Sequence, residues 1–74
     1  MEYYARYLRA LREDNDKTQK EIAELLGTSQ TMYARYERGA NDMPIRHLII
    51  LCLYYKVSAD TVLGLSDNRR EKRK

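Results

Sequence analysis

Apolar residues recur along this chain at intervals of three and four positions, which is the spacing of amphipathic helices, and no segment alternates as a strand would. In residues 2–13, Tyr4, Leu8 and Leu11 share one helical face, and arginines lie between them. The pattern therefore predicts an all-α fold whose first helix covers residues 2–13.

Residues that start and end helices divide the rest of the chain into four further helices. Thr18 and Glu21 have the spacing of a capping box, in which each side chain accepts a hydrogen bond from the other residue's backbone N–H. Gly27 and Gly39 can adopt the positive φ that ends a helix, and Pro44 suits the first position of one. We expect helices over residues 19–26, 30–38, 44–55 and 59–63.

Length and charge limit this architecture to one small domain. A chain of 74 residues can bury a single core but not two. Residues 69–74 carry five basic side chains and one acidic, whereas the preceding 68 residues carry nine basic and ten acidic. We expect a folded domain over residues 1–65 and a basic, disordered tail over residues 66–74. Since the folded part is not basic overall, nucleic-acid binding must be argued from where its charges lie.

Several classes of protein are disfavoured by what the chain lacks. Cys52 and His47 are its single cysteine and histidine, so neither an intrachain disulfide nor a Cys/His metal cage can form. The longest apolar run, residues 48–55, is far shorter than the ~20 residues of a membrane span, and the first residues have no signal-peptide core. We therefore expect a cytoplasmic protein. Because the sequence also has no phosphate-binding glycine loop and no catalytic pair, we expect no cofactor and no enzymatic activity. We assign Cys52 to the core and His47 to the surface.

Only three residues, beginning with Gly27, separate the predicted helices over residues 19–26 and 30–38. Two helices joined by so short a turn form a helix-turn-helix. Taken by itself, the polar face of the helix over residues 30–38 would be explained by solvent exposure. Together with the capping box and the short turn, however, it favours nucleic-acid binding, because the major groove of B-form DNA accommodates an α-helix.

One face of the helix over residues 30–38 carries the side chains that we expect to contact bases. Gln30, Thr31 and Arg35 lie on this face around Ala34, whose small side chain allows the helix backbone to approach a surface closely. Glutamine can pair with adenine, arginine with guanine, and threonine can contact a thymine methyl group. The alternative for Arg35 is that it binds phosphate alone.

Phosphate contacts are expected at the helix ends. Gln19 and Ser29 begin helices, where side chains and free backbone N–H groups attract phosphate, although Ser29 also caps its helix whether or not DNA is present. Arg38 supplies a positive charge at the end of the helix over residues 30–38.

The stretch TQKEIAELLGTSQTMYARYERG, followed by PIRHLIILCLYYKVSADTVLGL, resembles the helix-turn-helix domain of the Xre family of phage repressor and Cro-like bacterial regulators. The resemblance covers about residues 8–65. It implies a five-helix, lambda-repressor-like domain that places one helix in the major groove, usually as a dimer, to control transcription. The family pattern is matched at Gln19, Ala23, Gly27, Glu37 and Gly39.

The resemblance also implies roles for individual residues. It pairs Arg12 with Glu37 as a scaffold, and it places base contacts at the positions of Gln30, Thr31 and Arg35. Tyr33 departs from the pattern, because the family usually has isoleucine or valine there. Family members often carry basic residues in the loop after this helix. Here the loop has Ala40, Asn41 and Asp42 instead, which indicates either weaker contact with the DNA backbone or phosphate contact through Asn41 and backbone N–H groups.

The helix over residues 44–55 carries apolar residues on more than one face. Ile50, Leu53 and Tyr54 lie outside the face that we assign to the core, and an exposed apolar strip indicates a partner surface. We assign this strip to a homodimer interface, and the alternative is additional core beneath the N-terminal tyrosines. The assigned core face consists of Ile45, Leu48, Leu51, Cys52 and Tyr55.

These features together predict a sequence-specific regulator that binds double-stranded DNA, acting as a dimeric repressor on a near-palindromic operator. We favour repression over activation because no effector or activation domain accompanies the module. One alternative is a protein-interaction module with the same fold, such as an antitoxin or an antagonist of another regulator. Another is non-specific coating of DNA by the basic residues 69–74.

Overall fold

The computed structural model describes residues 2–65, with side chains from residue 4 onward, and all regular elements in this range are helices. They are α1 (Glu2–Asp14), α2 (Gln19–Leu26), α3 (Gln30–Arg38), α4 (Ile45–Tyr55) and α5 (Ala59–Leu63). The prediction of an all-α, five-helix domain is thereby confirmed, and each helix boundary lies within one residue of the expected position. The predicted basic tail lies outside the described residues. Within residues 2–65 no helix is both long enough and apolar enough to cross a bilayer.

Local hydrogen bonds explain where α2 and α3 begin and end. The Thr18 hydroxyl accepts the backbone N–H of Glu21 at 3.0 Å, and Glu21 Oε1 accepts that of Thr18 at 2.8 Å, which completes the capping box. This backbone hydrogen bond lowers the pKa of Glu21. Gly27 ends α2 with φ 73°, and a Cβ there would meet no atom within 4 Å. Glycine is therefore required at this position for its backbone conformation and not for space.

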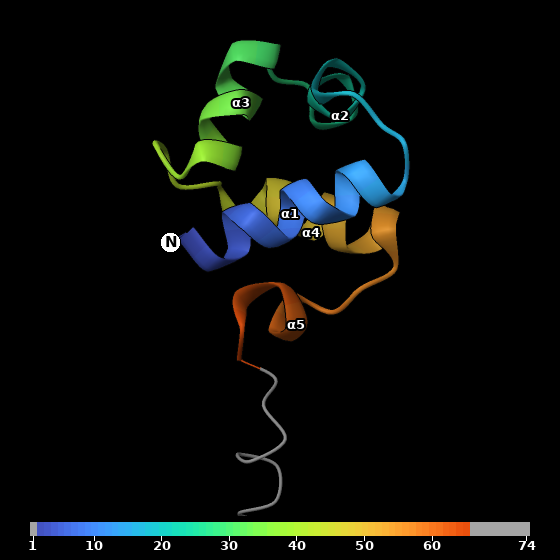
Figure 1. Cartoon of the computed structure of the whole chain (residues 1–74), viewed down its shortest axis with the longest axis vertical. Coiled ribbons are helices and arrows are strands. Elements are labelled where there is room, and N and C mark those ends of the chain that lie inside the picture. Colours follow the sequence, from blue (N-terminus) through green and yellow to red (C-terminus); the bar gives the residue numbers. More distant parts are fainter. Residues whose placement is uncertain (1, 66–74) are drawn as a thin grey trace, which may run out of the picture.

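The helices are arranged so that the helix-turn-helix forms one end of the domain (Figure 1). α2 and α3 pack against each other, and α3 also packs against α1. α1 and α4 both contact α5, which lies on the opposite side of α1 from α2 and α3 in Figure 1. Through its contacts with both α3 and α5, α1 consequently connects the helix-turn-helix to the C-terminal part of the domain.

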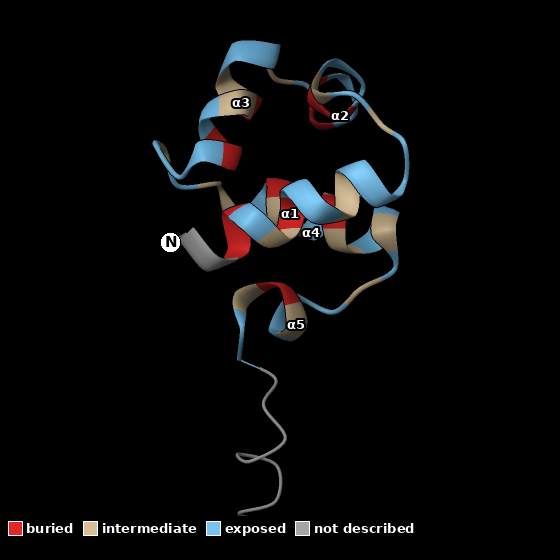
Figure 2. Ribbon diagram, in the orientation of Figure 1, coloured by how far each residue is buried: buried red, intermediate tan, exposed pale blue. Residues whose placement is uncertain are grey.

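A single core receives side chains from all five helices of the described chain (Figure 2). Each helix contributes one large side chain that is less than 2% exposed. Full burial of an apolar side chain stabilises a fold by roughly 1.5–3 kcal/mol, so every helix is held by its own anchor. These anchors are Leu8, Ile22, Tyr33, Leu51 and Val62.

Two predictions about α4 are wrong. Ile45, expected in the core, is 73% exposed, and His47, expected at the surface, is buried. Leu51 lies at the centre of the buried face, and at about 100° per residue Ile45 falls about 120° from it but His47 only about 40°. Because α4 is apolar on nearly every side, its sequence pattern does not indicate which side faces the core.

The exposed apolar surface of α4 is also displaced from the predicted one. Ile50 is half-buried and packs against the core, so its expected exposure is wrong, whereas Leu53 is 73% exposed and Tyr54 40% exposed. Ile45 and Ile49 precede Leu53 at intervals of four residues and share its side of the helix. Ile45, Ile49 and Leu53 are called the α4 strip below.

Candidate nucleic-acid interface

The turn between α2 and α3 is closed by hydrogen bonds on both sides. Thr28 donates its backbone N–H to the Ala23 carbonyl at 2.9 Å, which completes the end of α2. The Ser29 hydroxyl accepts the backbone N–H of Met32 at 3.0 Å, which caps the start of α3. The short turn therefore leaves little freedom in the direction of α3.

The inner face of α3 is buried, and this determines which residues face outward. Tyr33, Tyr36 and Glu37 are all buried, and the two tyrosine rings meet edge to face with centroids 6.2 Å apart. The residues that remain on the outer face are exposed, except for the half-buried Ala34. The exposed residues are Gln30, Thr31, Arg35 and Arg38.

Tyr33 fills the position at which the resemblance implied isoleucine or valine. Its side chain is fully buried, and within residues 2–65 its hydroxyl has no hydrogen-bond partner. Burial raises the pKa of the Tyr33 hydroxyl, and the nearby Glu37 carboxylate raises it further. The larger side chain is accommodated inside the core without turning the polar face of α3 inward.

Arg12 and Glu37, which the resemblance pairs, lie in direct contact. Arg12 Nε donates to Glu37 Oε2 at 2.7 Å, and Nη2 donates to Oε1 at 3.1 Å. The Gln19 amide donates to the same Oε1 at 3.1 Å, and Arg12 Nη1 donates to the Lys17 carbonyl at 2.9 Å. These bonds connect the end of α3 to α1 and to the start of α2.

The charge of Glu37 is stabilised although its side chain is only 3% exposed. Burial opposes ionisation, but the hydrogen bonds from Arg12 and Gln19, together with the nearby Tyr33 hydroxyl and the Arg12 charge, outweigh it and lower the pKa of Glu37. The carboxylate therefore stays ionised near neutral pH. Loss of either member of the pair would leave the other with an uncompensated charge in a largely dry site.

The four predicted phosphate-contacting residues differ in what they have available. Arg38 is exposed, and Ser29 keeps its hydroxyl hydrogen while it caps α3. Gln19 uses an amide hydrogen on Glu37, so its backbone N–H at the start of α2 is the group best placed for phosphate. Asn41 uses Oδ1 to accept a hydrogen bond from Arg35 Nε at 2.7 Å, a contact that the sequence pattern did not predict.

His47 of α4 packs against Tyr36 on the buried face of α3. Its Nδ1 and the Tyr36 hydroxyl share a hydrogen bond of 3.4 Å, and the two rings meet at 64° with centroids 5.9 Å apart. Burial lowers the pKa of His47, and the neighbouring Arg46 charge lowers it further. The imidazole is thus a neutral packing group, which the sequence reasoning missed because α4 gives no signal of its register.

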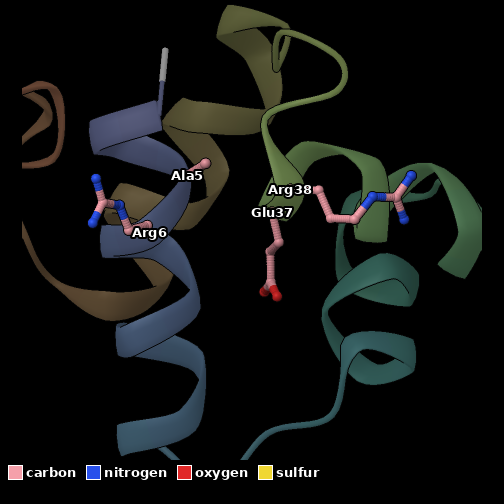
Figure 3. A pocket seen from close by; sticks show the side chains of 4 residues that line it. All are labelled: Ala5, Arg6, Glu37 and Arg38. Atoms are coloured by element: carbon pink, nitrogen blue, oxygen red, sulfur yellow. The ribbon is translucent and has the colours of Figure 1, made fainter.

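A hollow of about 300 Å³ lies between α1 and α3 and is lined by Ala5, Arg6, Glu37 and Arg38 (Figure 3). Glu37 points into the space between the helices, while the arginine side chains extend away from it on opposite sides. The Glu37 carboxylate in this hollow is already bonded to Arg12 and Gln19. Among residues 2–65, no group of His, Cys, Asp or Glu side chains could hold a metal ion.

Comparison with known proteins points to a family. The family described as helix-turn-helix matches residues 8–62. YobD of Bacillus subtilis, described as an uncharacterized HTH-type transcriptional regulator, is 37% identical over 65 residues, which cover 88% of this chain and 58% of YobD. The antitoxin PezA of Streptococcus pneumoniae is 32% identical over 57 residues, which cover 77% of this chain and 36% of PezA.

The chain thus matches less than two thirds of the length of either relative. No solved structure matches it with significance.

Proposed function

Because this chain belongs to the Xre-type helix-turn-helix family, we propose that it regulates transcription by binding a specific sequence of double-stranded DNA. The observation that carries the proposal is the outer face of α3, where Gln30, Thr31 and Arg35 are exposed together. The opposite face is held in the core by Tyr33 and by the Glu37 ion pair. A rigid helix with an exposed hydrogen-bonding face can enter the major groove.

Each of the three side chains has a base that it suits. The Gln30 amide can pair with N6 and N7 of adenine, the Arg35 guanidinium with O6 and N7 of guanine, and the Thr31 methyl with the methyl of thymine. The half-buried Ala34 between them presents no bulk that would keep the helix backbone away from the base edges.

Phosphate contacts would set the orientation of α3 in the groove. We assign them to Arg38 and to the helix starts at Gln19 and Ser29, where backbone N–H groups and the helix dipole favour an anion. The Asn41 amide nitrogen remains able to reach a phosphate although Oδ1 is engaged.

We propose that the DNA-bound form is a homodimer in the cytoplasm. Two copies would place their α3 helices in successive major grooves, about 34 Å apart, on a near-palindromic operator. The α4 strip with Tyr54 is the apolar surface assigned to the subunit contact, since large exposed apolar side chains indicate a partner. Occupation of such an operator would repress transcription by blocking polymerase.

Selection of bound sites from random duplexes tests the proposal. We expect a two-fold symmetric motif with half-sites one helical turn apart, and we expect Arg35→Ala to lose the preference at one guanine in each half-site. Leu53→Lys should shift the protein to monomer in sedimentation without changing its helix content. Failure of the unaltered chain to enrich any sequence would refute the DNA-binding function.

A second candidate is a protein-interaction module, because one relative is named an antitoxin and the α4 strip is exposed. In that case the fold would bind a protein partner through Leu53 and its neighbours. The two functions separate in genetic tests. An interaction module would lose its biological effect on Leu53→Lys but keep it on Arg35→Ala, and a DNA-binding regulator would lose it on Arg35→Ala.

A further inference from the structure

Arg35, in the last turn of α3, is exposed, but a hydrogen bond restrains its side chain. Its Nε donates a hydrogen bond to Asn41 Oδ1 at 2.7 Å. Within residues 2–65 the Arg35 guanidinium makes no other hydrogen bond. The N–H groups of Nη1 and Nη2 therefore remain available to a ligand. An exposed arginine without such a bond would distribute over many rotamers.

The backbone around Gly39 explains why Asn41 lies beside Arg35. Gly39 ends α3 with φ 75°, and the chain then folds back over the last turn of the helix. Ala40 donates its backbone N–H to the Arg35 carbonyl at 2.9 Å, and Asn41 donates its own to the same carbonyl at 3.4 Å. Asn41 is therefore bound to Arg35 through both its main chain and its side chain.

We propose that Asn41 is a positioning residue that aims the Arg35 guanidinium at a guanine, an inference that rests on the proposed function. With Nε occupied, the guanidinium presents the edge formed by Nη1 and Nη2, whose two N–H groups match O6 and N7 of guanine. A guanidinium held in this orientation loses less conformational freedom on binding. It is also restrained from turning toward a neighbouring phosphate, so Asn41 contributes to sequence discrimination through Arg35 and without a contact of its own to a base.

The test compares affinities for the selected operator and for a duplex substituted at the base pair whose preference Arg35→Ala abolishes. Asn41→Ala should reduce discrimination at that base pair by about 3- to 10-fold and leave preferences at the other base pairs unchanged. In the Arg35→Ala background, Asn41→Ala should have no further effect on discrimination. Such non-additivity is expected of residues that act through one another.

Two further variants separate positioning from other roles. Asn41→Asp keeps an oxygen acceptor for Nε, so it should retain discrimination while its negative charge weakens affinity for every duplex. Asn15→Ala is the matched control, because Asn15 is an exposed asparagine whose side chain also makes a local bond, to the Leu11 carbonyl at 2.7 Å. It should leave discrimination unchanged, and circular dichroism should show equal helix content in all variants.

The inference fails if Asn41→Ala weakens binding equally for all sequences, additively with Arg35→Ala and with a shallower salt dependence. That result would identify Asn41 as a phosphate contact. It also fails if Asn41→Ala changes nothing. Failure of the proposed function gives a different result, because the unaltered chain would then enrich no motif at all.

Discussion

α3 and α4 are neighbours in sequence and both contribute a fully buried side chain, but they expose opposite kinds of surface. α3 exposes polar and charged side chains and buries tyrosines and one ion-paired glutamate. α4 buries Leu51 and exposes isoleucine and leucine. A polar outer face can recognise base edges, whereas an apolar outer face suits another protein surface. We therefore assign the proposed DNA contact to α3 and the proposed subunit contact to α4.

The two helices are also held in different ways. α3 is attached by its buried tyrosines and, in addition, by a polar cluster in which Glu37 binds Arg12 and Gln19. α4 is attached by apolar packing around Leu51, with His47 as its buried polar group. The orientation of α3 should therefore depend on a few specific bonds, and that of α4 on shape and area.

The largest expected effect is on the α3 attachment. Glu37→Ala leaves Arg12 without its buried partner, and the loss of one member of such a pair costs about 3–5 kcal/mol. We expect this decrease in the free energy of unfolding in urea titrations followed by circular dichroism. Glu24→Ala removes an exposed glutamate of α2 and should change stability by less than about 0.5 kcal/mol. Equal effects of the two substitutions would show that the polar cluster does not hold α3.

On α4, a pair of leucines two positions apart should behave differently. Leu51→Ala creates a cavity in the core and should cost about 2–4 kcal/mol of unfolding free energy. Leu53→Ala, at a site that is 73% exposed, should cost less than about 0.5 kcal/mol in the monomer. The measurement is urea unfolding at a concentration where sedimentation shows a monomer. A larger cost for Leu53 would place the core on the other side of α4.

The ends of the two helices offer a smaller test. α3 ends at Gly39 with φ 75°, while α4 ends at Lys56 with φ 61°, a conformation that costs a non-glycine residue energy. Lys56→Gly should therefore raise the free energy of unfolding by about 0.5–1 kcal/mol, the relief of strain being partly offset by the flexibility of glycine when unfolded. Lys20→Gly, in the exposed first turn of α2, should instead lower stability. A loss of stability in Lys56→Gly would contradict the strain argument.

The contact between Tyr36 of α3 and His47 of α4 should have the smallest effect on stability at neutral pH. The pKa of His47 is lowered in the folded protein, so the unfolded chain binds more protons in the pH range below about 6.5. Stability should be complete above that pH and fall as the pH drops through the folded pKa. The lowered pKa of Glu37 adds a separate loss below about pH 4.5.

Thermal unfolding between pH 7.5 and 5.0 measures the His47 contribution. His47→Gln should remove most of the pH dependence above pH 5, since a glutamine does not titrate. An unchanged slope in this variant would assign the dependence to other groups.

The helix ends and the face of α3 could be predicted because their signals are local. The Thr18–Glu21 capping box and the glycines that end α2 and α3 act through hydrogen bonds within a few residues, and they occur where expected. In α3 the polar residues other than Glu37 and the bulky apolar ones fall on opposite sides, so the buried side could be inferred. The proposed roles of these residues in DNA binding remain predictions.

The register of α4 and the polar contacts of the interface could not be predicted in the same way. Ile45, His47 and Ile50 were misplaced because a helix that is apolar all round can turn almost any side to a core. The bonds from Arg35 to Asn41 and from Gln19 to Glu37 depend on where loops and helices meet in space.

The sequence by itself determined the number of helices, their ends and the side of α3 that meets solvent, because each of these follows from spacing and capping over one or two turns. The tertiary structure decided which side of α4 is buried and what holds the Arg35 guanidinium. Those outcomes depend on partners brought together by packing, whose identity no short stretch of sequence contains.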